Sequence, residues 1–185
     1  MRFASMRNLD ISNGEGVGVS IFVQGCDRHC FNCFNSETWD FNGGKEWTEE
    51  TKNKFIKLID RPYINRISVL GGEPLAEQNL DEVLSLIKEI RISFPKKTIW
   101  LYTGFEWNSL MSKICQPTFP DKDFEHIIEI HKKRKEIISL CNIVIDGEYI
   151  DEQRDITLKW RGSSNQRVID VKQSLAQNKI VLYCD

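Results

Sequence analysis

Residues 17–33 read VGVSIFVQGCDRHCFNC, and this stretch decides how the rest of the chain is interpreted. Its first half, 17–24, is rich in β-branched and aromatic residues and stops at a glycine, which predicts a strand. Its second half places Cys26, Cys30 and Cys33 in a CxxxCxxC spacing directly after that strand. Three close thiolates can hold three irons of a 4Fe–4S cluster and leave the fourth iron without a protein ligand. An iron with an open position can bind a small molecule, as the open metal position of a catalytic site does.

Two other structures could account for the three cysteines. Their spacing equals i, i+4 and i+7, so they could form a buried helix stripe, although three aligned free cysteines make an unusual one. Gly25, Asn32 and Asn35 favour a loop over a helix here. A zinc site needs four ligands in paired spacing, and His29 is the only histidine close by. The remaining cysteines are scattered, as Cys115, Cys141 and Cys184, and are expected as small buried hydrophobes.

The composition of the chain narrows its class and compartment. Of 185 residues, 41% are hydrophobic and 28% charged, which predicts one globular domain over residues 1–185. A net charge of −2 argues against a nucleic-acid binder. Residues 1–25 contain no continuous apolar run, so we expect neither a signal peptide nor a membrane span. Six cysteines without an export signal indicate a reducing compartment and therefore a cytoplasmic protein.

Beyond the cysteine segment, short apolar strands alternate with amphipathic helices. The apolar residues recur with strand or helix periodicity at the following places: strands at 64–70, 98–103 and 142–145, and helices after Thr48, over 77–90, within 105–114 and from Asp123 to about Leu140. This alternation implies βαβ units and an α/β fold with a mainly parallel sheet. Four such strands are too few to close an eight-stranded barrel, so we expect an open, partial (β/α) barrel. Function should then lie at the carboxyl ends of the strands.

The turn after the second predicted strand reads Gly71-Gly72-Glu73-Pro74. Whatever its function, it is suited to a tight strand-to-helix connection, with proline in the first turn of the helix. Glycines also let the backbone approach a ligand closely, and Glu73 offers an acceptor for an ammonium group. Two successive strands therefore end in a set of thiols and in a cradle suited to an amino acid.

With these two motifs the sequence resembles the radical S-adenosylmethionine superfamily, whose signatures are CxxxCxxC after the first strand and GGEP after the second. The resemblance implies a radical S-adenosylmethionine type of fold and a 4Fe–4S cluster ligated by Cys26, Cys30 and Cys33. In that family the amino and carboxylate groups of S-adenosylmethionine chelate the open iron. An electron from the reduced cluster then cleaves the sulfonium, giving methionine and a 5′-deoxyadenosyl radical.

The same resemblance assigns contacts to S-adenosylmethionine. Gly71, Gly72 and Glu73 would receive its methionine end, and Asn32 and Phe34 would contact the nucleoside. No catalytic residue beyond the cluster ligands is implied, because the cofactor carries the hard chemistry while the protein binds and shields it.

Further segments narrow the family. Residues 13–20 and 22–26 are similar to the entry of glycyl-radical activating enzymes. Within these, the family that activates anaerobic ribonucleoside-triphosphate reductase is matched by Cys33-Phe34-Asn35 with Thr38-Trp39, by 102–104, by 144–147 and by 161–167. The resemblance extends from about residue 10 to residue 171. The sequence departs from the family pattern at four places: Gly18 in place of arginine, Asn32 in place of glycine, Phe34 in place of tyrosine, and a helical insertion at residues 115–137.

The family resemblance predicts an oxidoreductase that forms a glycyl radical on the reductase, its protein substrate. Its electrons would come from a low-potential donor such as flavodoxin. Two rivals stay open: a small radical S-adenosylmethionine enzyme acting on a small molecule, as a deazapurine synthase does, and a non-catalytic iron–sulfur or zinc protein. Two local questions also stay open. Asp146 could bind ribose hydroxyls or cap a turn with Gly147, and 161–167 could be an exposed turn or part of the ligand pocket or docking surface.

Overall fold

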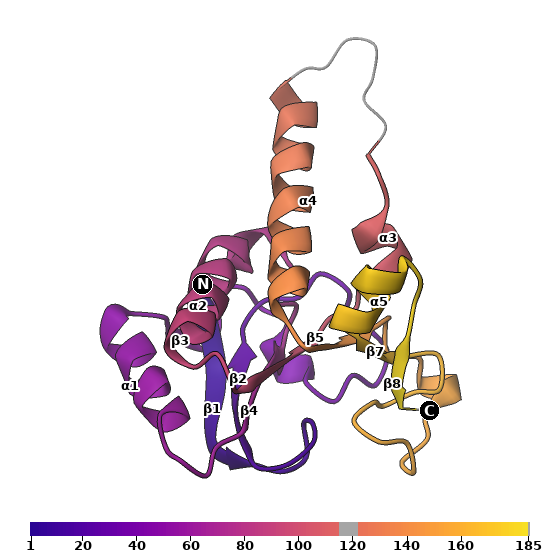
Figure 1. Cartoon of the computed structure of the whole chain (residues 1–185). Helices are drawn as coiled ribbons and strands as arrows, with labels where there is room; N and C mark the ends of the chain where they lie inside the picture. Colours follow the sequence, from indigo (N-terminus) through magenta and orange to yellow (C-terminus); the bar gives the residue numbers. More distant parts are fainter. Residues whose placement is uncertain (115–121, 185) are drawn as a thin grey trace.

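The computed structural model describes residues 1–114 and 122–184, and in these residues eight strands form one sheet (Figure 1). The order across the sheet is β3-β1-β2-β4-β5-β6-β7-β8. In chain order the strands are β1 Arg2–Asp10, β2 Gly18–Val23, β3 Lys45–Glu46, β4 Arg66–Gly71, β5 Thr98–Tyr102, β6 Ile143–Asp146, β7 Arg167–Asp170 and β8 Leu182–Cys184.

The middle of the sheet is parallel and its two sides are antiparallel. Strands β2, β4, β5 and β6 pair in parallel, in the order of the sequence. Strand β1 runs antiparallel to both β2 and β3, and β7 runs antiparallel to β6 and β8. The expected mainly parallel sheet is therefore limited to the four central strands. The β1–β2 and β6–β7 connections contain no crossover α-helix, so these neighbouring strands pair antiparallel. The α/β class is confirmed.

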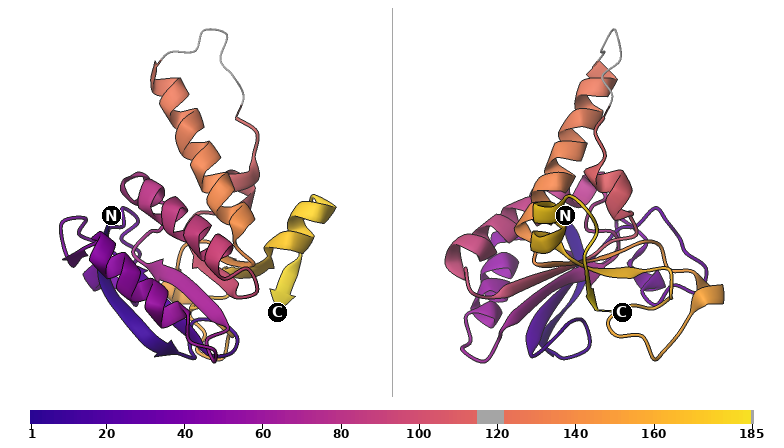
Figure 2. Two further views of the ribbon diagram at one scale, coloured as in Figure 1. Left: turned by 60° about the vertical axis from the view of Figure 1, so that its left-hand side comes forward. Right: turned by 45° about the vertical axis from the view of Figure 1, so that its right-hand side comes forward.

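Helices cover one face of this sheet (Figure 2). The helices are α1 Glu49–Ile59, α2 Leu80–Ser93, α3 Trp107–Met111, α4 Lys122–Leu140 and α5 Val171–Gln177, with short 3₁₀ turns η1 Ser36–Thr38, η2 Glu77–Asn79 and η3 Asp151–Gln153. Thr48 caps α1 as predicted, since its hydroxyl accepts a hydrogen bond from the Thr51 amide. Phe55 of α1 and Ile87 of α2 belong to the same buried core as Val69 of β4.

The other face of the sheet is partly polar. Ser20, Arg66 and Ser68 are fully buried there, beside a smaller apolar group that includes Trp100 and Ile145. The segment 11–16 packs against this face at the amino ends of the parallel strands. A Cβ added to Gly14, whose φ is 132°, would lie 2.5 Å from the Arg66 side chain, so glycine is required for this close approach.

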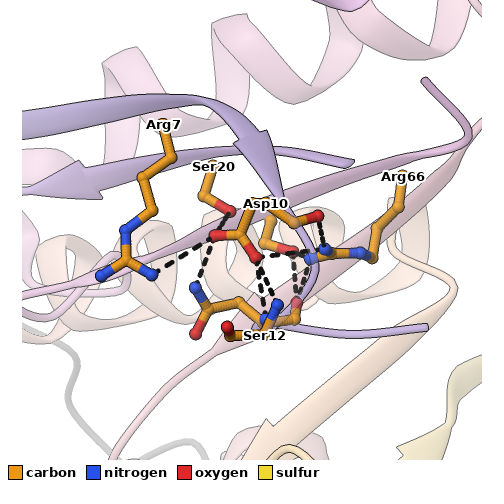
Figure 3. A network of polar contacts seen from close by, with 7 residues as sticks. Arg7, Asp10, Ser12, Ser20 and Arg66 are labelled. Atoms are coloured by element: carbon orange, nitrogen blue, oxygen red, sulfur yellow. Dashed lines mark hydrogen bonds and ion pairs between the residues drawn. The ribbon is translucent and has the colours of Figure 1, made fainter. Parts of the chain in front are cut away.

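A buried ion pair holds this amino end together (Figure 3). Arg66 donates to the Asp10 carboxylate at 3.2 Å and to the Asp10 carbonyl oxygen at 2.7 Å. The same carboxylate accepts hydrogen bonds from the Ser20 hydroxyl at 2.6 Å and from the Ser12 and Asn13 amides. Burial by itself would raise the pKa of Asp10, but these hydrogen bonds outweigh it and lower the pKa to about 2.

Several sequence expectations differ from the structure. Asp123 does not cap the long helix, because α4 begins at Lys122 and Asp123 lies inside its first turn. The predicted insertion at 115–137 lies partly outside the described residues, as does Cys115; the part that is described belongs to α4. Strands β1, β3 and β8 and helix α5 were not predicted. No helix among the described residues is long and apolar enough to cross a membrane.

Candidate functional site

The carboxyl ends of β2, β4, β5 and β6 form a rim around a cavity of about 560 Å³. Seven of the eight residues that the sequence singled out line this cavity: Cys26, Cys30, Cys33, Phe34, Gly71, Gly72 and Glu73. Asn32 is the exception. The topology explains the convergence, because parallel strands with right-handed connections place all their carboxyl ends at one edge.

The three cysteines lie on an irregular loop over residues 24–35, called here the cysteine loop. His29 and Asn32 have positive φ angles of 48° and 53°, which no α-helix contains, so the alternative of a buried helical stripe is wrong. Asn32 adopts the left-handed conformation that asparagine tolerates better than most residues. This conformation accounts for an asparagine at a position where the family resemblance leads one to expect glycine.

The donor set of the cysteine loop fits a cluster better than a single ion. Cys26, Cys30 and Cys33 are half-buried and carry free thiols. Among the described ranges, no three His, Cys, Asp or Glu side chains converge closely enough to hold one metal ion. In a cubane each thiolate binds a different iron, so the three sulfurs need not converge on one point. Zinc would need tetrahedral convergence, which this loop does not show.

The thiols also carry an electrostatic signature. Burial raises the pKa of Cys26 and of Cys30, and the pKa of Cys30 is raised further by the negative Glu148 and by Cys33. Thiols with raised pKa values are protonated in the metal-free protein, so binding of a cluster must release protons.

The turn Gly71-Gly72-Glu73-Pro74, called here the glycine turn, follows β4 and is hydrogen-bonded to the backbone at the end of β2. The Gly72 amide donates to the Val23 carbonyl oxygen at 2.9 Å, and the Glu73 amide donates to that of Gly25 at 2.8 Å. A Cβ at Gly72 would lie 2.4 Å from the Gly25 carbonyl oxygen, so a side chain there would push the two strand ends apart. The glycines therefore position the cysteine loop directly beside the turn.

Glu73 is a buried carboxylate that links the rim. One oxygen accepts hydrogen bonds from the Leu75 amide at 2.9 Å and the Thr103 hydroxyl at 2.8 Å, and the other accepts from the Gly104 amide at 2.8 Å. Burial raises its pKa, while these hydrogen bonds oppose the rise. Two carboxylate oxygens offer about four acceptor sites, so about one remains for a ligand. The contact of Glu73 with an ammonium group stays a prediction.

The two residues predicted to contact a nucleoside lie differently. Phe34 lines the cavity, where its ring packs against Tyr149 with centroids 5.1 Å apart. Asn32 instead donates from its amide nitrogen to Asp151 at 2.9 Å, outside the cavity lining. A direct contact of Asn32 with a nucleoside therefore has no geometric support, and the role of Phe34 stays a prediction.

The two local questions from the sequence have structural answers. Asp146 accepts a hydrogen bond from the Trp107 amide at 2.7 Å, at the start of α3, and pairs with Arg167. Asp146 is fully buried and does not line the cavity, so it anchors structure and is not placed to bind a ribose. The segment 161–167 folds over the end of β6, where the Gln166 side chain bonds Gly162 and Gly147. Arg161, Gly162 and Gln166 line the cavity, so this segment is part of the pocket wall.

Sequence reasoning missed Arg28, a residue between the first two cysteines. Its guanidinium pairs with Glu148 and lies 3.5 Å from Glu73. The motif by itself carries no signal for this residue, because its partners lie 45 and more positions away along the chain.

Comparisons with known proteins agree with this geometry. Residues 12–169 match the family model described as a 4Fe-4S single cluster domain. An anaerobic ribonucleoside-triphosphate reductase-activating protein of Salmonella typhi is 33% identical, over 91% of this chain and 97% of that protein. Proteins of the same name from Escherichia coli K12 and Enterobacteria phage T4 are 32% and 31% identical, each over 91% of this chain. The matches cover 97% of the former protein and 93% of the latter.

Proposed function

Because the chain belongs to the family of anaerobic ribonucleoside-triphosphate reductase-activating proteins, we propose that it forms a glycyl radical on such a reductase. The substrate is the backbone Cα–H of one glycine in the reductase. A reduced 4Fe–4S cluster held by Cys26, Cys30 and Cys33 would supply the electron for cleavage of S-adenosylmethionine, and the radical from that cleavage would remove the hydrogen atom. The relatives do not favour either rival, the small-molecule enzyme or the non-catalytic metal protein.

The chain's own residues have distinct tasks in this proposal. Cys26, Cys30 and Cys33 hold the cluster, and the glycine turn with Glu73 receives the methionine end of S-adenosylmethionine. Phe34, packed on Tyr149, shields the nucleoside from water. We further propose that the sheet is the open, partial barrel of the radical S-adenosylmethionine type, in one domain, and that the protein works in the cytoplasm with a flavodoxin-like donor.

One observation carries this proposal above the others. The cysteine loop and the glycine turn come from different strands, yet they are joined by backbone hydrogen bonds and line the same cavity. A structural iron–sulfur site would have no use for a ligand-sized cavity of about 560 Å³ next to its thiols. This cavity supports the proposal, because a small molecule bound in it would lie beside the open iron of a cluster held by the three thiols.

The test is a reconstitution under anaerobic conditions. The protein is loaded with iron and sulfide, reduced, and incubated with S-adenosylmethionine and the anaerobic reductase. We expect 5′-deoxyadenosine together with a glycyl radical signal in electron paramagnetic resonance. Deoxyadenosine without a glycyl radical would favour a small-molecule enzyme, and a reduced cluster that produces neither would favour a non-catalytic protein.

A further inference from the structure

Arg28 connects the cysteine loop to three other strand ends of the rim. Its guanidinium forms an ion pair with Glu148 after β6, lies 3.5 Å from Glu73 after β4, and stacks over the ring of Phe105 after β5 at 4.2 Å. The side chain is only 20% exposed and lines the cavity together with the cysteines. A residue between two cluster ligands thus reaches across the whole site.

The Arg28 side chain passes over a glycine. A Cβ at Gly104 would lie 2.3 Å from the Arg28 Cδ, so the aliphatic part of the arginine passes directly over that glycine. The guanidinium of Arg134 in α4 also stacks on the Phe105 ring, with its Cζ 4.3 Å from the ring centroid. Arg134 donates its Nε to the Leu75 carbonyl oxygen at 2.9 Å, which holds the ring and the α4 side of the rim together. The guanidinium of Arg28 is therefore held by contacts from several elements.

The pair places two opposite charges beside the thiols. Arg28 lies in the cysteine loop two residues before Cys30, and Glu148 is paired with it. Both residues line the same cavity as Cys26, Cys30 and Cys33, so both charges act on a negative charge held at these sulfurs. Glu148 is about half exposed and Arg28 is mostly buried, so water screens the carboxylate more than the guanidinium.

We propose that Arg28 and Glu148 act as an ion pair that sets the reduction potential of the cluster held by the cysteine loop. Arg28 is a positioning residue in this role and does not itself react. The inference rests on the proposed function, because it requires a cluster on Cys26, Cys30 and Cys33.

The sign of the effect follows from the charge of reduction. Reduction adds an electron, so a nearby cation stabilises the reduced cluster and raises the potential, while a nearby anion lowers it. Net charge around the sulfurs is one of the factors that set such potentials. Because the two charges oppose each other, removing one must shift the potential in the direction opposite to removing the other.

The experiment compares potentials of the full-length protein without S-adenosylmethionine and without reductase. Wild type, Arg28→Gln, Glu148→Gln, the double variant and Arg28→Lys are reconstituted, and the cluster is titrated under anaerobic conditions by electron paramagnetic resonance. We expect a more negative potential for Arg28→Gln, a more positive one for Glu148→Gln, and for the double variant a value between those of the two single variants. Arg28→Lys keeps the charge and should lie closer to wild type than Arg28→Gln.

Each outcome of the titration has a meaning for the inference. Shifts of the two single variants in the same direction, or no shift in either, would overturn it. If Arg28→Gln fails to hold iron, Glu148→Gln and Arg28→Lys still decide, since Glu148→Gln must then raise the potential and Arg28→Lys must leave it near wild type. A wild-type protein that binds no 4Fe–4S cluster contradicts the proposed function itself, whereas a loaded protein with unshifted variants contradicts only the role of the ion pair.

Discussion

Two arginine–carboxylate pairs lie at opposite ends of the parallel strands and differ in what surrounds them. At the amino ends, Asp10 and Arg66 have fully buried side chains, and backbone and hydroxyl groups surround them (Figure 3). At the carboxyl ends, Arg28 and Glu148 border a cavity and keep some exposure to solvent. A buried pair is committed to the fold, because breaking it leaves an uncompensated charge away from water. A pair at a cavity wall can act on whatever the cavity holds.

The largest effect is expected at the carboxyl ends of the parallel strands, which border the cavity and are called here the open end. Cys30→Ala should abolish cluster binding and therefore glycyl-radical formation, because three thiolates are needed for three irons. Its metal-free stability should stay near wild type, since Cys30 lies on an irregular, half-buried loop. Iron and sulfide analysis and thermal unfolding measure the two quantities. Cys184→Ala, in β8, is the control and should retain the cluster; full activity of Cys30→Ala would sink the ligand assignment.

At the amino ends of the parallel strands, called here the closed end because the Asp10–Arg66 pair is fully buried there, the expected effect is on folding. Asp10→Ala leaves the Arg66 guanidinium uncompensated, which should lower the free energy of unfolding by about 3–5 kcal/mol. Urea denaturation of the metal-free protein measures it. Glu46→Ala breaks the ion pair of Arg2 with an exposed Glu46, at 3.6 Å, and should cost under about 1 kcal/mol. Equal losses for the two variants would mean that the buried pair has no special weight.

The closed end should also respond to acid. The pKa of Asp10 is lowered to about 2 from 3.8, so its contribution to stability is complete above about pH 4 and is lost as the pH falls toward 2. A shift of this size corresponds to about 2.5 kcal/mol. Denaturation midpoints between pH 6 and 3 should fall more steeply for wild type than for Asp10→Asn. Parallel curves would show that Asp10 does not titrate in this range.

Glu73 tests whether a carboxylate at the open end binds a ligand or only braces the rim. Glu73→Gln keeps the shape of the side chain. The NH₂ group of the glutamine would then face the Thr103 hydroxyl or the Gly104 amide, each of which donates a hydrogen bond to the carboxylate in the wild type. If an ammonium group also depends on the charge, affinity for S-adenosylmethionine should fall by roughly tenfold to hundredfold. Iron content should not change.

Titration of S-adenosylmethionine against the reduced cluster, followed by electron paramagnetic resonance, measures that affinity. Glu77→Gln, on an exposed side chain of η2, is the matched control. Coincident binding curves for wild type and Glu73→Gln would show that Glu73 is a bracing residue alone.

The smallest effect is expected at Asn32. Its positive φ makes Asn32→Ala unfavourable by about 1 kcal/mol, whereas Asn32→Gly removes the side chain without that strain. If the residue serves the conformation of the cysteine loop, Asn32→Gly should keep wild-type affinity for S-adenosylmethionine and Asn32→Ala should weaken cluster retention. A loss of affinity in Asn32→Gly would restore a direct contact of its side chain.

Reading the sequence located the open end far better than the closed one. The thiols and the glycine turn can be recognised in the sequence from residue type and spacing, and the central strands from short apolar runs. Strand β1 was missed because its half-exposed residues show no clear alternation, and β8 because it is short. Asp10 and Arg66 carry no local signal either, since they lie 56 positions apart and only the fold brings them together.

The sequence by itself determined the parallel centre of the sheet, the position of the three cysteines after β2 and the glycine turn, because local periodicity and short motifs encode them. Tertiary structure alone decided the antiparallel sides, the anchoring role of Asp146 and the two arginine pairs. These depend on strand order and on side chains that meet across long stretches of chain. Burial then decides what each arginine–carboxylate pair can do. The fully buried Asp10–Arg66 pair stabilises the fold, whereas the Arg28–Glu148 pair borders a cavity, where its charges can act on a ligand.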